Sequence, residues 1–385
     1  MIIKGVDAKA ILDSRKEKTI EVSIKTDAGN FDASAPNGKS TGKREVKSYK
    51  KDIGGDIKTI RDFSDYFSEE NIEKFDDLRR IEDIVDRQIG ANTLFALESA
   101  ILKAIASEKK CEIWELIDKD AKKFPRLVGN CIGGGKHSDI LKKPDFQEFL
   151  LIPKSKSVKE AFELNKKIKS NIESSLKKSD KDFKSKKSDE NAWMTSLNEK
   201  QVLDILSETN IPIGTDVAAS SFFKRKKYFY MNPLLKRTIE EQESYLINLI
   251  KNSNIFYIED PFSEENFESF SKLLKKFPDR LIVGDDLTVT NSKRLEKAIK
   301  MKSINAIIVK PNQCGSLLEV KKVCEIAKKN NIQIVFSHRS GETGENILAD
   351  LAFGFQADFF KCGIDGKERE SKLKRLIEIE KGLKN

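Results

Sequence analysis

The chain has 385 residues, 35% of them charged, and its excess of basic residues gives a formal net charge of +9. This length is enough for two domains with ample core, and the basic balance permits acidic partners such as nucleic acid, anionic lipid or phosphorylated metabolites. Because the basic residues are interleaved with Asp and Glu and lack recurring aromatic neighbours, they indicate a solvated lysine-rich surface, and we do not expect nucleic-acid binding.

Cysteine usage and hydropathy exclude further classes of protein. The five cysteines are odd in number and form no CxxC pair, which argues against a disulfide framework or a zinc site and favours a reducing compartment. No charged-then-apolar segment precedes the first predicted strand, and no apolar run approaches the roughly 20 residues that cross a bilayer. We therefore expect a cytoplasmic protein without a membrane partner.

Residues 1–123 have the pattern of an α+β domain. Residues 19–25 alternate apolar and polar side chains, a turn follows, and residues 31–35 form a second strand, which predicts a hairpin. The next segment, 36–42, is a loop of small residues whose backbone amides could approach an anion. Helical periodicity recurs over residues 60–67, 71–88 and 92–108. We expect these helices to form a layer against the hairpin.

The pattern changes over residues 124–385, where apolar runs end in chemically useful polar side chains. These runs are residues 146–152, 211–216, 255–260, 281–285, 306–310, 332–338 and 358–361. The later runs recur about every 25 residues, the length of one βα unit in a (β/α)₈ barrel, whose active-site groups collect at the C-terminal ends of the strands. The sequence therefore predicts an α/β protein, with an α+β domain over 1–123 followed by a barrel domain over 124–385.

One strand, helix, strand unit at residues 281–310 indicates the chemistry. Its first strand ends in Asp285 and Asp286 and its second in Lys310, so parallel strands would bring acid and amine to the same end of a sheet. Carboxylates that hold a hard cation beside a lysine are a reasonable means of removing a weakly acidic C–H proton. The alternative interpretation is two exposed acids and a solvated lysine on loops.

Residues 174–191 interrupt this pattern. They are poor in apolar side chains, which predicts a mobile surface loop. Glu190 lies at the end of this segment, and composition alone would make it a solvated charge.

Two long segments are distinctive, Gly-Asp-Asp-Leu-Thr-Val-Thr-Asn at 284–291 and Ser-His-Arg-Ser-Gly-Glu-Thr at 337–343. Further shared segments are residues 11–15, 37–42, 147–149, 258–262, 310–313 and 360–363. Together they resemble the enolase (phosphopyruvate hydratase) family, in that family's order along nearly the whole chain. The resemblance implies a small α+β domain followed by an enolase-type TIM-like barrel whose first units depart from the usual βα order.

The resemblance also implies a ligand set for two Mg²⁺ ions. Asp216, Glu259 and Asp285 match the carboxylate ligands of the tightly bound ion, and their hard oxygens suit it. Ser40 matches the loop serine that helps to hold a second Mg²⁺ against the substrate phosphate. The implied substrate is therefore a small phosphorylated acid.

Catalytic roles carry over from the family in the same way. Lys310 matches the general base that takes the proton next to the carboxylate of 2-phosphoglycerate, and Lys361 matches a residue that, with the metal ions, stabilises the charge that develops there. Glu190 matches the acid that helps the hydroxyl to leave, with Glu148 beside it.

The remaining family positions are two histidines and a phosphate clamp. His137 and His338 are the only histidines of the chain, and both match active-site positions of the family. Arg339 and Ser340 match the clamp, where a planar guanidinium fits a phosphate.

The chain departs from the family pattern at several loops. Lys-Glu-Lys stands at 16–18 in place of Gly-Asn-Pro, and the glycine-rich Asp-Glu-Gly-Gly around the acid is replaced by Asp-Glu-Asn-Ala at 189–192, followed by Trp193. The lost glycines and the bulky Trp193 should change how this loop approaches substrate. The His137 loop, 135–139, lacks the usual small residues after the histidine, which bears on lid closure.

The predicted oligomer is a homodimer or larger assembly with an altered interface. Glu378 stands where the family tends to have an arginine that pairs across the dimer with a glutamate, here Glu21. Two facing acids would repel, so the interface should be weakened or differently built.

Three functional hypotheses follow from the sequence. The first is an enolase that interconverts 2-phosphoglycerate and phosphoenolpyruvate. The second is a related enzyme that abstracts a proton from another acid substrate, although the Arg339 and Ser340 clamp and Ser40 suit a phosphate. The third is a non-catalytic binding protein that uses its basic surface.

Overall fold

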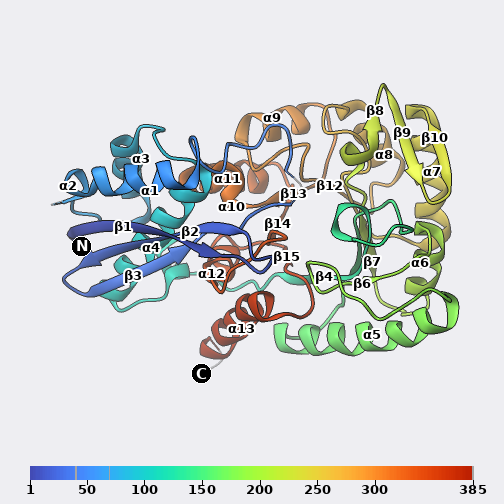
Figure 1. Ribbon diagram of the computed structural model, residues 1–385, viewed down its shortest axis with the longest axis horizontal. Coiled ribbons are helices and arrows are strands. Elements are labelled where there is room, and N and C mark those ends of the chain that lie inside the picture. The colour runs from blue at the N-terminus through green and yellow to red at the C-terminus, as the bar shows by residue number, and fades with distance from the viewer. Residues whose placement is uncertain (40, 69, 384–385) are drawn as a thin grey trace.

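The N-terminal part of the chain is built on a three-stranded sheet. The computed structural model describes residues 1–39, 41–68 and 70–383. In it, β1 (Ile3–Leu12), β2 (Lys18–Thr26) and β3 (Gly29–Ser34) pair antiparallel in that order, at the blue end of the chain in Figure 1. Alternate residues of β2 are buried because one face of the sheet packs on α4 (Ala91–Lys109). The predicted hairpin is confirmed, and β1 is a further strand that the sequence analysis missed.

The other helices of this region differ in extent from those predicted. The helix expected at 60–67 begins earlier, as α1 (Ile53–Asp62), where the Asp52 side chain accepts a hydrogen bond from the Gly55 N–H, and it ends before the short α2 (Ser64–Phe67). The two glycines in the first turn of α1 conceal its start. The helix expected at 71–88 is only α3 (Leu78–Val85), preceded by the 3₁₀ turn η1 (Phe75–Asp77). The helix predicted at 92–108 is confirmed as α4.

A closed barrel follows. In the part of the chain that the structure describes, its eight strands are β4 (Arg126–Gly133), β5 (Glu148–Leu151), β7 (Ile213–Asp216), β11 (Tyr257–Glu259), β12 (Leu281–Gly284), β13 (Ala306–Val309), β14 (Gln333–Ser337) and β15 (Phe359–Lys361). β15 pairs with β4 and closes the ring, while β5 runs antiparallel to both of its neighbours. The predicted fold class, an α+β domain followed by a TIM-type barrel with an irregular start, is confirmed.

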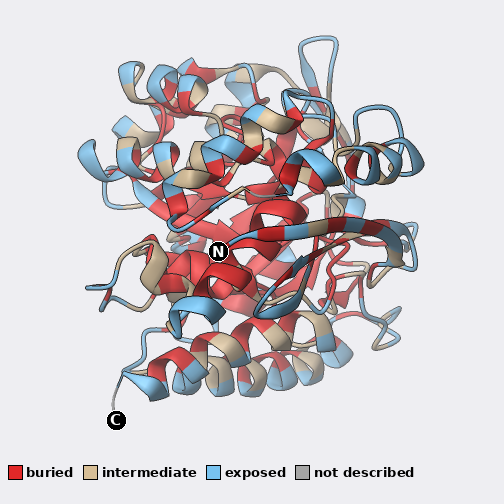
Figure 2. Cartoon of the chain, turned by 90° about the vertical axis from the view of Figure 1, so that its left-hand side faces the viewer, coloured by how far each residue is buried: buried red, intermediate tan, exposed pale blue. Residues whose placement is uncertain are grey.

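Helices and smaller elements surround the barrel (Figure 1). The helices are α5 (Val158–Ser179), α6 (Glu199–Ser207), α7 (Ile239–Ser253), α8 (Phe267–Lys276), α9 (Ser292–Lys300), α10 (Pro311–Cys314), α11 (Leu317–Lys329), α12 (Ile347–Gly354) and α13 (Lys367–Gly382), with the 3₁₀ turns η2 (Ile113–Leu116), η3 (Gly135–His137) and η4 (Ala219–Phe222). The added strands are β6 (Trp193–Met194), which extends the barrel sheet beside β4, and the separate sheet of β8 (Phe223–Lys224), β9 (Lys227–Met231) and β10 (Leu234–Arg237). Figure 2 shows the buried residues gathered in the central strands and on the inner helix faces.

One loop prediction is wrong in part. Residues 174–179 are not loop but the last turns of α5, which ends at Ser179. The apolar positions of α5 that face the barrel, among them Ile172 and Leu176, are buried, so this sparse apolar stripe suffices to hold the helix. Among the described residues, no helix combines the length and the apolar character that crossing a bilayer needs.

Candidate active site

The alternation of side chains along the barrel strands carries charged residues into one mouth of the barrel. Strand side chains point inward at every second position, and Tyr257, Val283, Ile308 and Phe359 belong to the cluster that fills the barrel interior. The residues two positions further along the chain are Glu259, Asp285, Lys310 and Lys361. Because these strands are parallel, the four charged side chains meet at the C-terminal end of the barrel.

Lys361 is the centre of one ion-pair cluster. Its Nζ lies 2.9 Å from both carboxylate oxygens of Glu259, 3.2 Å from Asp216 Oδ2 and 3.3 Å from Glu148 Oε1. The Lys361 side chain is only 2% exposed and that of Glu259 is fully buried. Burial disfavours the charged amine, but the negative charges around it, that of Asp216 foremost, outweigh burial and raise the pKa of Lys361 well above its ordinary value. Lys361 is therefore positively charged among these acids.

Lys310 forms a second pair with Asp285. Its Nζ donates to Asp285 Oδ2, while the other oxygen of Asp285 accepts from Gln313 Nε2 at 3.0 Å. Burial would lower the pKa of Lys310, but the charge of Asp285 outweighs it, so the pKa is raised. A cation that engaged Asp285 would remove this support and leave Lys310 free to act as a base.

Two further acids lie against Asp285. Asp260 accepts hydrogen bonds from the backbone N–H groups of Asp285, at 3.0 Å, and Asp286, at 2.6 Å. Carboxylate oxygens of Asp260, Asp285 and Asp286 lie within 4.8 Å of one another, close enough to hold a metal ion. Burial and then neighbouring acids raise the pKa values of Asp260 and Asp286 well above the ordinary range. A divalent cation would relieve this concentration of acid, and carboxylate oxygens are the ligands that Mg²⁺ takes.

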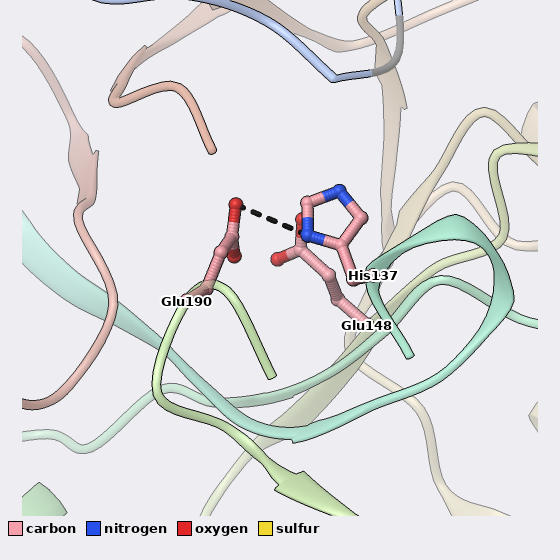
Figure 3. A group of neighbouring side chains, drawn as sticks. All are labelled: His137, Glu148 and Glu190. Carbon is pink, nitrogen blue, oxygen red and sulfur yellow. Dashed lines mark ion pairs between the residues drawn. The ribbon is translucent and has the colours of Figure 1, made fainter. Parts of the chain in front are cut away.

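The opposite wall of the mouth carries His137, Glu148 and Glu190, whose side chains point toward one another (Figure 3). His137 Nδ1 lies 3.3 Å from Glu190 Oε1, and Glu190 Oε2 accepts from Asn130 Nδ2 at 2.9 Å. His338 Nε2 lies 3.7 Å from Glu190 Oε2. The composition-based expectation that Glu190 is solvated is wrong, since the residue is 3% exposed. Contacts from β4, η3 and the segment after β14, all distant in sequence, bury it.

The charges on this wall shift the pKa values of Glu190 and Glu148 in opposite directions. Burial opposes ionisation of Glu190, but the charge of the neighbouring His137 outweighs it and lowers the pKa of Glu190. Burial, then the charge of Glu190, raise the pKa of Glu148 well above its usual value. Burial would lower the pKa of His137, yet Glu190 and Asp189 raise it to about 9. Glu148 and His137 therefore hold protons beside an ionised Glu190, the kind of separated pair that suits acid–base work.

Burial lowers the pKa of His338 well below its ordinary value. Neither ring nitrogen of His338 makes a hydrogen bond to the described residues, and Glu148 Oε2, Gln147 Oε1 and Asn130 Oδ1 are likewise buried without a partner there. Unpaired buried polar atoms are costly. Their concentration on one wall indicates a place for a polar ligand.

Arg339 and Ser340 bring the N-terminal segment onto the barrel mouth. Arg339 Nη1 and Nη2 lie 3.0 and 3.2 Å from the two oxygens of Glu45, which follows β3 in the chain. Ser340 Oγ accepts from the Lys39 backbone N–H at 2.8 Å. Gly38 has no side chain, and a Cβ there would stand 1.9 Å from Arg339 Nη2, so only glycine lets the backbone lie this close to the guanidinium.

The walls enclose a cavity of about 30 Å³. It is lined by Gly38, His137, Gln147, Glu148, Glu190, Asp216, Ala218, Asp260, Asp285, Asp286, Lys310, Ser337, His338, Arg339, Ser340 and Lys361. This volume holds about one water molecule. A larger ligand must therefore displace the lysine ammonium groups or move the loops that cover the mouth.

The structure brings together nearly all of the side chains that the sequence analysis singled out. Glu259 does not line the cavity but contacts it through Lys361, and Ser40 lies outside the described residues. Trp193 is buried and donates from Nε1 to the Lys169 carbonyl of α5 at 3.0 Å, away from the cavity lining. Sequence reasoning missed Glu45 and Asn130, which support Arg339 and Glu190. Asp260, Asn312 and Gln313 lie in segments that carry the resemblance, but no role was assigned to them, and they support Asp285 and Arg339.

Known proteins resemble this chain along nearly its full length. Residues 3–117 match the family described as the enolase N-terminal domain, and residues 121–385 match the enolase C-terminal TIM barrel domain. A protein named enolase from Methanosphaera stadtmanae is 37% identical over 100% of this chain and 98% of its own length. Enolases from Pyrobaculum aerophilum and Methanothermobacter thermautotrophicus are each 35% identical, covering 94% and 99% of this chain and 91% and 97% of their own lengths.

Proposed function

Since the chain belongs to the enolase family, we infer that it is a phosphopyruvate hydratase. It is a lyase of glycolysis that interconverts 2-phosphoglycerate with phosphoenolpyruvate and water. We propose that Lys310 is its base and that Glu190, with Glu148 beside it, is its acid. The observation that carries this assignment is that one cavity has Lys310 among carboxylates on one wall and the glutamate and histidine cluster on the other.

In the proposed reaction, two groups act on adjacent carbons of the substrate. Lys310 takes the proton from the carbon next to the carboxylate, the hydroxyl on the following carbon leaves as water with a proton from Glu190, and a C=C bond forms. The ammonium group of Lys361 stabilises the negative charge that builds on the substrate carboxylate. To act as the acid, the ionised Glu190 must first receive a proton, and both Glu148 and His137 hold one beside it.

The phosphate would bind at the seam between the barrel and the N-terminal segment. Arg339 offers a planar guanidinium and Ser340 a hydroxyl, and we propose Ser40 as a further ligand there. Glu45 holds the guanidinium in position through both of its nitrogens. An arriving phosphate would therefore meet an arginine that is already oriented. His338, neutral and with both nitrogens unbonded among the described residues, is proposed to contact the substrate.

The enzyme uses a divalent metal, and we propose two Mg²⁺ ions in each site. Asp216, Glu259 and Asp285 would hold the first, because hard carboxylate oxygens at three adjacent strand ends suit it. Ser40 is proposed to help to hold the second. Bound metal would supply positive charge beside the substrate carboxylate and would engage the Asp285 oxygens that now support the charge of Lys310.

The site takes a small phosphorylated substrate, and we propose that the working unit is a homodimer or larger assembly in a cytoplasmic setting. Five free cysteines suit a reducing compartment. Glu21 lies 2.7 Å from Lys9, and Glu378 lies 3.9 Å from Arg375. Glu21 is thus paired with a nearby cation, whereas Arg375 is held mainly by Asp350 and Glu112, so the repulsion expected between the two acids in a dimer would be only partly reduced. Light scattering on the purified protein tests the oligomer.

Ultraviolet absorbance tests the function itself. Purified protein given 2-phosphoglycerate and Mg²⁺ should form phosphoenolpyruvate, and EDTA should stop the reaction. A related enzyme for another acid substrate would show no turnover of 2-phosphoglycerate, and a non-catalytic binding protein would bind it without turning it over. Strong salt-dependent binding of nucleic acid without any turnover would support the binding protein.

A further inference from the structure

Lys39 spans the mouth of the cavity. Its backbone N–H is bonded to Ser340 on the phosphate side, and its side-chain Nζ lies 3.3 Å from Asp189 Oδ2 and 3.6 Å from Asp139 Oδ1 on the opposite side. The preceding Gly38 is pressed onto the guanidinium of the clamp, so the backbone that carries Lys39 is held in place. One residue thus joins three segments that are far apart in the sequence.

Lys39 supplies positive charge beside the carboxylate of Asp189. Its side chain is 11% exposed, and neither oxygen accepts a well-aligned hydrogen bond from the described residues. A carboxylate in this environment is costly unless opposite charges lie near it. The described cations within ion-pair distance of it are Lys39 and His137, each at 3.3 Å.

His137 is shared between two acids. Its Nδ1 lies 3.3 Å from Asp189 Oδ1 and equally 3.3 Å from Glu190 Oε1. If Lys39 were absent, Asp189 would have to draw its compensating charge from His137 alone. The imidazole would then be held more strongly by Asp189 and less by Glu190, which is the proposed acid.

We propose that Lys39 is a positioning residue for the loss of water, because it neutralises Asp189 and so leaves His137 available to Glu190. The proposal rests on the function proposed above. The ion pairs of Lys39 lie on the acid side of the reaction, so this residue should matter for dehydration and not for proton removal.

The two ion pairs of Lys39 should contribute unequally to the interaction energy. Asp139 is 87% exposed, and an exposed pair contributes little because water screens it. Asp189 is mostly buried, so its charge responds to the loss of a partner. Asp139→Asn is therefore expected to leave the rate of dehydration nearly unchanged, whereas Lys39→Met should lower it.

The test compares two rates in the full-length protein with Mg²⁺. One is exchange of the substrate proton with deuterium oxide, which reports on Lys310, and the other is formation of phosphoenolpyruvate. Lys39→Met should slow dehydration roughly tenfold, less than the 10²- to 10⁴-fold contribution of a catalytic acid itself, and leave exchange within about twofold. Lys39→Arg, which keeps the positive charge, should restore most of the rate. Thermal unfolding checks that each variant folds.

Two further variants separate charge from simple loop damage. Lys142→Met removes an exposed lysine from the loop that carries His137 and should behave as the parent protein does. Adding Asp189→Asn to Lys39→Met removes the uncompensated acid and should recover part of the dehydration rate. Dehydration at the parental rate in Lys39→Met, or an equal loss of exchange and dehydration, would overturn the proposal. A parent protein that performs neither step would instead overturn the proposed function.

Discussion

Arg339 and Glu45 face each other across the seam between the barrel and the segment that follows β3, with both guanidinium nitrogens on the carboxylate at 3.0 and 3.2 Å. Their side chains are 4% and 9% exposed. The pair therefore has two consequences, one for folding and one for substrate.

Arg339→Gln should weaken both substrate binding and stability. It leaves Glu45 buried without its main cation, which costs about 3–5 kcal/mol of the free energy of unfolding, and it raises KM by removing the phosphate clamp. The double variant Arg339→Gln with Glu45→Gln should regain most of the stability but not the KM. Urea unfolding and steady-state kinetics measure the two effects, and a double variant as unstable as the single one would contradict this account.

Lys310→Ala should abolish exchange of the proton next to the substrate carboxylate, because no other base occupies that position. Metal binding should persist, since Asp285 keeps its carboxylate and loses only a competing cation. Exchange followed in deuterium oxide tests the first statement and metal titration by calorimetry the second. Lys300→Ala, an exposed lysine at the end of α9, is the matched control. Exchange at the parental rate in Lys310→Ala would show that the base is misassigned.

Glu190→Gln should spare proton exchange and lower dehydration by roughly 10²- to 10⁴-fold, the range for loss of a general acid. The amide has nearly the same shape as the carboxyl, so the fold is preserved, but it cannot donate the proton. The same two assays measure this variant. Glu163→Gln on the exposed face of α5 is the control, and a loss of exchange equal to the loss of dehydration would argue against the assigned role.

Mg²⁺ should stabilise the protein as well as activate it. A ligand that binds only the folded state raises the melting temperature with concentration, and it would relieve the repulsion among Asp260, Asp285 and Asp286. Thermal unfolding with Mg²⁺ or with EDTA checks this, and Asp285→Asn should lose most of the shift. A melting temperature indifferent to Mg²⁺ in the parent protein would contradict the proposed metal site.

Asp180 should make the loop that carries Glu190 sensitive to acid. It accepts hydrogen bonds from Thr195 Oγ1 and Ser196 Oγ, both at 2.6 Å, and from the Ser196 N–H at 2.7 Å. Burial opposes ionisation, but the bonds from Ser196 and Thr195 lower the pKa of Asp180 below its ordinary 3.8. A lowered pKa adds stability that is present above the unfolded-state value and is lost as the pH falls through the folded-state value.

Asp180→Asn should therefore lower the free energy of unfolding by about 1–3 kcal/mol near neutral pH, because buried donors lose an ionised acceptor. The difference from the parent should narrow as the pH falls below 3.8. Urea unfolding at a series of pH values measures it. Asp182→Asn, exposed in the same segment, is expected to lack the effect, and a difference that grows in acid would reverse the sign of the argument.

The barrel and its charged mouth could be predicted from sequence patterns because side chains along a strand alternate between its two faces. The charged ends of β11, β12, β13 and β15 lie two positions beyond inward apolar residues. Apolar runs locate those strands, and the alternation of side chains by two residues then places Glu259, Asp285, Lys310 and Lys361 at the mouth. The family resemblance then supplied roles that no pattern could, and these roles stay predictions, as does the domain boundary at residue 123.

Other parts of the site have no local signal. Glu190 lies in a polar segment and is buried only because Asn130, His137 and His338 converge on it from elsewhere in the chain. Glu45 has a role in the site only because the segment after β3 folds against Arg339. Asp260 ends an apolar run, but its role depends on the hydrogen bond that it accepts from the backbone at the end of the next strand. Such contacts depend on tertiary structure, which local composition does not encode.

The pairing of β15 with β4 has a consequence for synthesis on the ribosome. Lys361 lies on β15, so the cation that holds Glu148, Asp216 and Glu259 together reaches them only after residue 361 has emerged. Until then the growing barrel has an open seam and a mouth of mutually repelling carboxylates. The nascent enzyme must therefore remain inactive, and in need of protection from aggregation, until β15 has been made.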